Sequence, residues 1–487
     1  MKCRAKGVLI IGLICTLCLE GTAQDYQGIQ GSPYAGSLGV ANNPASILST
    51  PYKWDITIFS AQLKTTTNAI TVTNLSYLHP FIHRRDSLDY YWNSGYMRRY
   101  GAVNYNLHLL NVRLALNRKQ AISFGANLKS YGAVRMSPFA YIDTIGNFNQ
   151  FFAMNYGTSS YEGEAVSSTW LELYGTYSKT LIDDEVGRLN GGVTLKLMRG
   201  ISGAYAKFSG GGVSSTYINS QLVYTLAKGD VQYGYSSNYD SWNSDHSTTT
   251  NLHNFLSQSQ GGAAIDIGFE YLVKTQDVHI YGEPDDYYDY DWKIGAALLD
   301  IGVNQYQYGN QSRIAANPKN IVSDQELDEK FDYVQTVAGF NDSLATIMGS
   351  IRTPRGIFRI WNPARFELNI DRPLPEHFAV NADLTLNLGG NNMGKQLFTK
   401  QITLFALTPR WETRNLGGYL PVTVTTDGKV WVGGAVKAGP FLLGVHNWGN
   451  VFSKQKIQNG GFYLALVIRP EDGFRLKEKK EYTCPKD

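Results

Sequence analysis

Charged residues are scarce in this 487-residue chain. Asp, Glu, Lys and Arg together make up 17% of it, against about 25% in ordinary soluble proteins. Aromatic residues reach 13%, and 32 residues are tyrosine. The mean hydropathy of −0.25 is too low for a bundle of membrane helices. This composition is typical of a membrane β-barrel, whose strands are apolar on one face only, although a secreted protein of two packed β-sheets would have a similar one.

Cysteine is almost absent beyond the first residues. Residues 1–23 have the pattern of a signal peptide, because three basic residues precede the apolar stretch 7–19 and small residues follow it. We expect cleavage after Ala23. The apolar stretch is shorter than the roughly 20 residues that a membrane-spanning helix needs. Three of the four cysteines would leave with this peptide, so Cys484 would remain alone and no internal disulfide is expected.

The chain also lacks the usual signs of nucleic-acid binding and of catalysis. Cleavage would remove three basic residues and Glu20, leaving 41 basic and 40 acidic side chains, a balance that does not favour nucleic acid. The eight histidines show no paired metal-ligand spacing. Phosphate-binding loops and GxSxG nucleophile motifs are missing. We therefore expect no cofactor, no metal site, no catalytic residue and no enzyme, with a catalytic set drawn from distant strands as the alternative.

Much of the sequence instead alternates between apolar and polar residues with a period of two, which predicts β-strands. In residues 377–388, for example, Phe378, Leu384 and Leu386 lie on the face opposite Asn381 and Asp383. Strands of this kind are expected at 54–63, 102–117, 121–135, 168–181, 190–206, 261–275, 288–306, 364–374, 377–389, 402–412, 416–426, 429–438, 441–448 and 460–470.

The connections between these segments are alternately short and long almost throughout, except that the short Asp427-Gly428 falls where a long connection is expected. Residues 117–120 and 182–189 are short, for example, whereas 136–167 and 207–260 are long. Outer-membrane barrels alternate in this way because their periplasmic turns are tight and their extracellular loops are long. The sequence therefore predicts an all-β protein, an antiparallel transmembrane barrel of about fourteen strands. A soluble two-sheet protein would not explain the alternating connections.

A barrel of this size is too wide to be filled by its own apolar side chains. The apolar faces should therefore point to lipid and the charged faces to the lumen. The charged residues expected to line the lumen are Arg113, Lys129, Glu172, Lys196, Asp266, Glu270, Arg365, Glu367, Asp371 and Asp383. Aromatic residues near strand ends are expected to form girdles at the membrane interfaces, namely Trp54, Trp170, Trp292, Trp361, Trp411, Trp431, Trp448, Tyr287, Tyr288 and Tyr290.

The rest of the chain divides around the barrel, which is expected to span residues 54–470. Residues 24–53 are rich in Gly, Ser, Ala and Asn without a period, and are expected to form a plug in the barrel mouth. Residues 323–337 are expected to be a helix within a long loop, because Ser323 and Glu326 have capping-box spacing. Residues 471–487 are expected to be a charged periplasmic tail.

Three short stretches carry a resemblance to known barrels. The box Asn43-Pro44-Ala45 before the first strand resembles the N-terminal plug motif of FadL-type outer-membrane transporters and of the related PorV-type barrels of Bacteroidetes. The stretch "GAALLDIGVNQYQY" (295–308) is similar to a mid-barrel strand of that group. Residues 409–448 resemble an uncharacterised Bacteroidetes family of outer-membrane barrels. The chain departs from many such barrels in continuing past Pro470 instead of ending on an aromatic residue.

The resemblance implies a location in the Gram-negative outer membrane, with outer-membrane lipid and lipopolysaccharide as neighbours. FadL-type barrels imply uptake or binding of a small, partly hydrophobic ligand such as a fatty acid. The alternative, implied by PorV-type barrels, is a scaffold or anchor in a surface-secretion or gliding assembly. In that case the long connections 207–260 and 307–363 would bind partner proteins.

Overall fold

A computed structural model describes the chain over most of its length. The described residues are 26–73, 89–157, 160–218, 220–243, 245–274, 289–319, 322–389, 396–400, 402–426, 428–452 and 456–470. The expectations for residues 1–23 and 471–487, and for Tyr287 and Tyr288, concern residues outside this set.

The predicted fold class is confirmed: fourteen barrel strands, some of them interrupted, close into an antiparallel barrel. Each strand pairs with the next along the chain, and the last pairs with the first, from Ile56 opposite Ile468 to Gln62 opposite Tyr463. The barrel strands are β1 (Trp54–Thr67), β4 (Gly95–Asn117), β5 (Gln120–Tyr141), β6 (Tyr161–Asp183), β7 (Gly187–Ile218), β9 (Gln260–Lys274), β10 (Tyr290–Gln307), β14 and β15 (Ile357–Trp361 and Arg365–Pro373), β16 (Phe378–Asn387), β18 (Leu404–Glu412), β19 and β20 (Leu416–Tyr419 and Val422–Thr425), β21 and β22 (Val430–Val432 and Gly434–Ala438), β23 (Phe441–Val445), and β24 and β25 (Asn459–Gly460 and Phe462–Ile468).

The apolar faces of these strands point outward. On β21 and β22, Val430 and Val436 are 61% and 58% exposed, whereas Trp431 and Lys437 are each 1% exposed. A soluble sheet would bury the valines and expose the lysine. The alternation is complete on β18, where buried inward-facing residues alternate with exposed outward-facing residues along the whole strand. The barrel therefore presents hydrocarbon-like side chains on its outer surface, as a bilayer requires.

The two ends of the barrel differ. At one end, which we call the turn end, the connections are short, as between Asn117 and Gln120 or between Asp183 and Gly187. The opposite end, the loop end, carries the longer connections. The expectation that the connections 207–260 and 307–363 contain no strands was wrong. β7 continues to Ile218, and five further strands follow within these two segments. They are β8 (Gln221–Tyr235), β11 (Arg313–Pro318), β12 (Val322–Ser323), β13 (Met348–Arg352) and β14.

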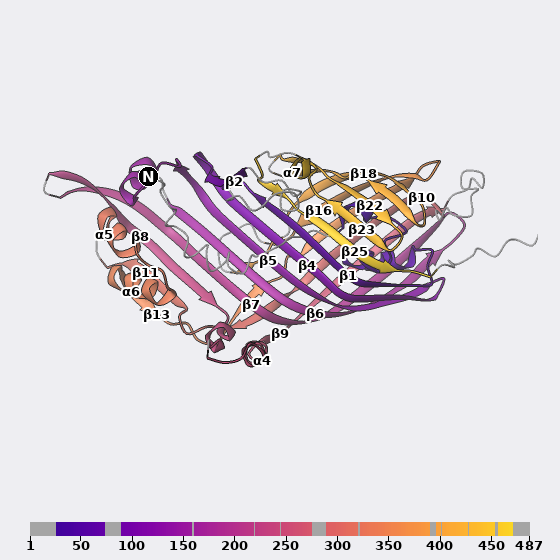
Figure 1. The fold of residues 1–487 in the computed structure, drawn as a ribbon, viewed down its shortest axis with the longest axis horizontal. Helices are drawn as coiled ribbons and strands as arrows, with labels where there is room; N and C mark the ends of the chain where they lie inside the picture. Colours follow the sequence, from indigo (N-terminus) through magenta and orange to yellow (C-terminus); the bar gives the residue numbers. More distant parts are fainter. Residues whose placement is uncertain are drawn as a thin grey trace, which may run out of the picture.

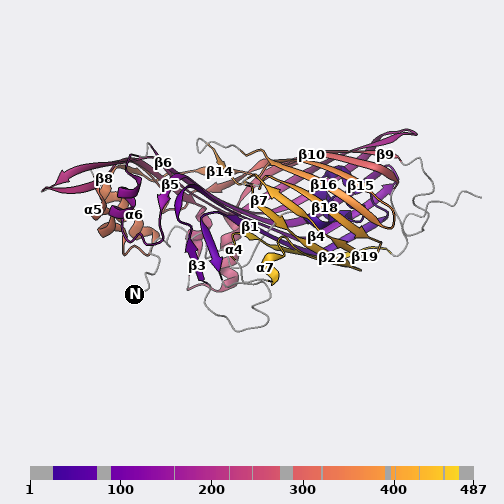
Figure 2. The same cartoon turned by 90° about the horizontal axis from the view of Figure 1, so that it is seen from above.

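The strands β8, β11, β12 and β13 extend the sheet of β7 beyond the barrel and form what we call the loop-end assembly (Figures 1 and 2). Helices α3 (Phe148–Asn155), α5 (Asp324–Phe331) and α6 (Val337–Ile347) belong to it. Its core consists of Phe152, Ala315, Val322, Leu327, Leu344, Ile347 and Met348. One face of this sheet packs on helices, and its strands lack the clear apolar period of the barrel.

The loop-end assembly is also held by polar contacts. The Tyr233 hydroxyl donates a hydrogen bond to the side-chain oxygen of Asn341 on α6. Burial raises the pKa of Tyr233 to about 12, although the positive charge of Arg313 opposes the shift. The hydroxyl therefore stays protonated at neutral pH and keeps its hydrogen bond.

The remaining elements of the long connections are β2 (Ile70–Thr73), β3 (Asp89–Trp92), η4 (Ser237–Ser241), α4 (Thr248–Ser257), β17 (Leu397–Phe398) and α7 (Gly449–Phe452).

The helix expected at 323–337 begins as predicted but ends early. The Ser323 side chain accepts a hydrogen bond of 3.1 Å from the backbone N–H of Glu326. The helix stops at Phe331, because Thr336 caps a second helix by accepting from Gly339 N–H at 3.0 Å. Two capped helices therefore replace the single predicted one.

The aromatic residues expected in interfacial girdles do not all face outward. Trp292, Trp361 and Trp411 are 36–39% exposed. Trp170 and Trp431 are instead fully buried and face inward, as does Tyr290. Position near a strand end does not reveal which face a side chain occupies.

None of the helices in the described part of the chain has the length and apolarity needed to cross a membrane.

The outward face leads to a first prediction. Leu195 on β7 is 63% exposed between residues that face inward. Replacing it with Arg should lower the free energy of unfolding by about 2–4 kcal/mol, because a charge would then face hydrocarbon. The control Tyr333→Arg changes an 83% exposed residue of the loop-end assembly and should alter stability by about 0.5 kcal/mol or less. Urea unfolding in lipid vesicles measures both, and equal losses would contradict the orientation of the barrel face.

Candidate functional site in the lumen

Residues 26–53 lie inside the barrel, and we call them the inner segment. They form three short 3-10 helices, η1 (Gln27–Ile29), η2 (Gly36–Ala41) and η3 (Pro44–Leu48). The Asn43 side chain caps η3 by accepting a hydrogen bond of 2.9 Å from Ala45 N–H. Pro44 occupies the first helical position, where its missing N–H costs nothing. The Asn-Pro-Ala box therefore has a local structural role as a helix start.

The same box is fitted against the barrel wall. Asn43 Nδ2 donates to the carbonyl oxygen of Phe269 at 2.9 Å, and Ser178 Oγ donates to the carbonyl oxygen of Pro44 at 2.7 Å. Two wall glycines leave the necessary room. A Cβ atom on Gly268 would lie 2.1 Å from Asn43 Oδ1, and one on Gly192 would lie 2.6 Å from the backbone of the box. Only residues without a side chain permit this close approach.

The inner segment has an apolar side, which packs on the wall formed by β19 to β25. This contact is a continuous apolar cluster of Tyr26, Ile29, Ala35, Leu38, Tyr419, Ala435, Leu442, Tyr463, Ala465 and Val467. Hydrogen bonds also cross it, because Gly28 N–H donates to the Tyr463 hydroxyl at 3.0 Å. The cluster explains why several inward positions of these strands are apolar.

The other side of the inner segment makes polar contacts with β1, β4, β6, β7 and β9. The Arg113 guanidinium donates to the carbonyl oxygens of Ile47 and Tyr52 at 2.7 and 2.9 Å. It also pairs with Asp55 at 3.2 Å, and Asp55 accepts from Ser37 N–H at 2.6 Å. Arg113 and Asp55 are 1% exposed or less. A buried ion pair thus connects the wall to the inner segment through backbone groups.

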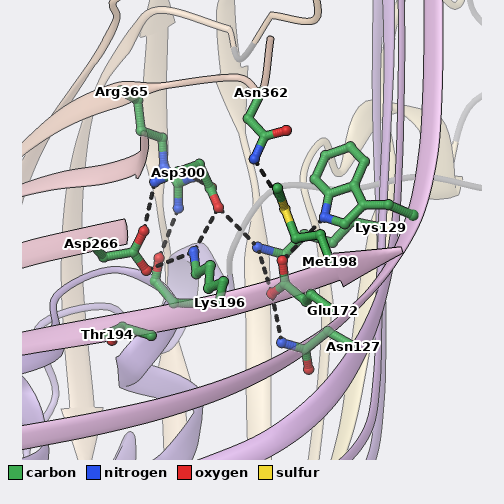
Figure 3. A network of polar contacts seen from close by, with 12 residues as sticks. Asn127, Lys129, Glu172, Thr194, Lys196, Met198, Asp266, Asp300, Asn362 and Arg365 are labelled. Atoms are coloured by element: carbon green, nitrogen blue, oxygen red, sulfur yellow. Dashed lines mark hydrogen bonds and ion pairs between the residues drawn. The ribbon is translucent and has the colours of Figure 1, made fainter. Parts of the chain in front are cut away.

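A larger ion cluster lies beside it and is centred on Asp300 (Figure 3). The Asp300 carboxylate accepts from Lys129 at 3.3 Å, from Lys196 at 2.6 Å and from Arg365. Its backbone N–H donates to Asp266 at 2.6 Å. Glu172 and Asp266 supply further carboxylates, 3.0 Å from Lys129 and 2.6 Å from Lys196 respectively. Three cations therefore share one central carboxylate, and two more acidic groups balance the charge.

This cluster also holds the inner segment in place. Arg365 donates to the carbonyl oxygen of Ala41 at 2.7 Å and pairs with Glu367 at 2.6 Å. Glu367 accepts from Gln30 at 3.2 Å, and Gln30 also donates to Asp383 at 2.6 Å. The inner segment therefore completes the hydrogen bonding of a wall whose charges are buried.

An aromatic layer covers the cluster on its loop-end side. The next inward residues in that direction are Tyr131 after Lys129, Trp170 after Glu172, Met198 after Lys196 and Ala264 after Asp266. These four form one apolar cluster, in which the rings of Tyr131 and Trp170 stack with centroids 5.4 Å apart. The layer excludes water from the ion pairs below it, which strengthens them.

A second ion cluster lies nearer the turn end. Arg410 pairs with Asp371 at 2.5 and 2.9 Å and with Glu412 at 2.7 Å. Asp371 accepts from the Tyr290 hydroxyl at 2.6 Å, and Glu412 accepts from Ser32 of the inner segment at 2.7 Å. The inner segment is thus attached to both ion clusters.

All ten residues expected to line the lumen are no more than 5% exposed in this structure. Arg113 lies in the pair with Asp55. Lys129, Glu172, Lys196, Asp266, Arg365 and Glu367 lie in or beside the Asp300 cluster. Asp371 pairs with Arg410, Asp383 accepts from Gln30, and Glu270 accepts from Ser49. The described residues include no group of three or more His, Cys, Asp or Glu side chains arranged to hold a metal ion.

The sequence analysis missed the central residue, Asp300. It has a positive φ of 56° and sits where the pairing of β10 with β9 shifts between Leu298 and Ile301. At this β-bulge the Asp300 carboxylate faces inward and the alternation breaks, because the consecutive residues Leu299 and Asp300 are both buried. An Asp at such a break is a usable signal, because Asp tolerates positive φ better than most residues.

The fold and the paired charges of its lumen define a membrane β-barrel whose fold resembles those of Gram-negative outer-membrane proteins. The chain belongs to the DUF5723 family, a family of unknown function, whose pattern matches residues 44–445. A comparison with curated proteins finds no match.

Solved structures similar to this chain include three FadL-type barrels, each with low sequence identity. The Ralstonia pickettii toluene transporter TbuX has 12% identity and a TM-score of 0.39, with 93% of this chain and 99% of that chain covered. A mutant of the monoaromatic hydrocarbon channel TodX has 11% identity and a TM-score of 0.43, with 92% and 98% covered. A Pseudomonas aeruginosa FadL homologue has 10% identity and a TM-score of 0.40, with 93% and 99% covered.

The Asp300 cluster leads to a second prediction. Asp300→Asn preserves the tolerance for positive φ but leaves three buried cations without their shared carboxylate, so the free energy of unfolding should fall by about 3 kcal/mol or more. The control Asp289→Asn removes a partly exposed carboxylate that lies 2.9 Å from Arg188 and should cost about 1 kcal/mol or less. Denaturant unfolding in detergent micelles measures both, and similar losses would show that Asp300 is not central to the lumen.

Proposed function

We propose that this protein is exported to the outer membrane of a Gram-negative cell and there binds or takes up a small, partly hydrophobic ligand. Outer-membrane lipid and lipopolysaccharide would surround its apolar outer face. The inner segment would control passage through the lumen. No catalytic step is needed in this proposal.

The observation that carries the proposal is the order of side chains along the lumen. Nearest the loop end lies an aromatic and aliphatic cluster of Val166, Tyr205, Tyr306, Phe358 and Ile360. The layer with Tyr131 and Trp170 follows, and then the charged residues and the inner segment. A ligand entering from the loop end would meet apolar groups first and polar groups second. That order suits a molecule with an apolar body and a polar group.

The attachment of the inner segment fits a gate. Its contacts with the wall are hydrogen bonds and apolar packing, both of which are reversible. The bond from Arg365 to Ala41 and the bond from Asn43 to Phe269 are examples. Displacing the segment would expose buried charges on the wall, and a passing ligand or water would have to replace those contacts.

The third prediction tests this gate. Deleting residues 24–53 should raise the permeability of the barrel to small solutes, because the described contacts of that segment cross the lumen. Asn43→Ala should raise it less, since it removes one helix cap and one hydrogen bond to the wall. The control Asn415→Ala changes an exposed residue of a tight turn and should have no effect. Liposome swelling measures permeability. Before that, a difference in gel mobility between unheated and heated samples should show that each variant is folded. Unchanged permeability in the folded deletion variant would refute the proposed gate.

A second candidate function is a scaffold for surface proteins, and the loop-end assembly supports it. Tyr217 and Tyr333 are 74% and 83% exposed on this assembly, and exposed tyrosines are common in protein–protein interfaces. Purification in a mild detergent separates the two functions. Stoichiometric protein partners, lost on changing both tyrosines to Ser, would favour the scaffold. A barrel that purifies alone with bound small molecules would favour uptake.

A further inference from the structure

An arginine interrupts the apolar outer surface of the barrel. On β15 the outward residues Phe366, Leu368 and Ile370 are apolar, and Arg372 follows them on the same face. The Arg372 side chain is exposed, whereas the neighbouring Asp371 is fully buried in the lumen. Arg372 therefore places a positive charge on the outer surface, near the turn end of the strand.

Trp292 lies against this charge. Lys293 on β10 is the register partner of Asp371 on β15, so the adjacent outward residues, Trp292 and Arg372, lie side by side on neighbouring strands (Figure 2). The guanidinium carbon of Arg372 lies 4.7 Å from the centroid of a Trp292 ring. Trp292 is itself partly exposed on the outer surface. Stacking of this kind orients a guanidinium and leaves the N–H groups at its edge able to donate hydrogen bonds.

No acidic group in the described part of the chain neutralises Arg372. Its guanidinium makes no hydrogen bond or ion pair with another described residue. Asp371 points into the lumen and pairs with Arg410. Asp291 precedes Trp292 in the chain and forms no ion pair with Arg372 either. A guanidinium carries five N–H donors, so this one needs acceptors from outside the described chain.

The surroundings of Arg372 indicate where those acceptors come from. Toward the loop end lie Ile370 and its register partner on β10, Ile294. Toward the turn end lie Leu374 and Phe378, both exposed on the outer surface. A charge on a lipid-facing strand is tolerated near the edge of the hydrocarbon layer, where a long side chain reaches the lipid head groups. The anionic group at that depth of a membrane is a lipid phosphate.

We propose that Arg372 and Trp292 bind the phosphate of a phospholipid in the periplasmic leaflet of the outer membrane. The guanidinium would donate two hydrogen bonds to phosphate oxygens, and the acyl chains would lie along Ile294 and Ile370. The short turns of outer-membrane barrels face the periplasm, which assigns the site to that leaflet. The inference rests on the outer-membrane location in the proposed function and does not depend on uptake of a ligand.

The fourth prediction compares two phospholipids with identical acyl chains, the anionic phosphatidylglycerol and the zwitterionic phosphatidylcholine. Native mass spectrometry of the full barrel in detergent should show that phosphatidylglycerol binds about fivefold more tightly, because no choline group offsets its phosphate charge. Arg372→Gln should remove this preference. Arg372→Lys should retain part of it, because lysine keeps the charge but not the planar fork. Trp292→Leu should lower it about twofold, since the stack that orients the guanidinium is lost.

Lys179→Gln is the matched control. Lys179 is also exposed on the outer surface, on β6, but no aromatic ring of a described residue stacks on it, so its replacement should leave the preference unchanged. A difference in gel mobility between unheated and heated samples should show that each variant is folded. Equal losses in Lys179→Gln and Arg372→Gln, or a preference that survives Arg372→Gln, would overturn the site and leave uptake intact. A barrel that binds neither lipid and does not enter liposomes would refute the outer-membrane location as well.

Discussion

Charge pairing inside a closed wall is the constraint on which the rest of this structure depends. The outer face must be largely apolar to contact lipid, so many ionisable groups of the strands face the lumen. There they are nearly inaccessible to water, and a buried charge is tolerated only with a counter-charge and further hydrogen bonds. Asp300 meets this need for three cations at once. The charges of the barrel wall therefore have to be paired with one another, and the inner segment supplies further hydrogen bonds to them.

The inner segment follows from the same constraint. Arg113, Arg365 and Glu367 all make contacts with it in addition to their contacts on the wall. These contacts use backbone carbonyls and an amide side chain, so they depend on where the segment lies more than on its charge. Its opposite side is apolar and packs against strands whose inward residues are apolar as well. A segment without a regular sequence period thus acquires a defined position from the two kinds of wall that it contacts.

Much of the barrel could be predicted from sequence because a lipid-facing strand obeys a strict period of two. Residues 377–388 are an example, and their inward Asn381 and Asp383 are buried in the structure. The prediction failed where that period is lost. Leu404 and Ala406 of β18 point inward although they are apolar, because they complete the interior packing. β8 and β11 lie outside the barrel, where no bilayer imposes a period. The bulge at Asp300 hid the residue that organises the lumen, since one extra residue shifts every later side chain to the other face.

The position of the inner segment has a consequence for biogenesis. It precedes β1 in the chain, yet it packs against Tyr463 of β25, the strand that pairs with β1 to close the wall. Suppose that the barrel closed before this segment entered. The segment would then have to pass through one end of the barrel, and ion pairs already formed in the lumen would have to separate. We therefore expect the inner segment to enter before the seam between β1 and β25 closes.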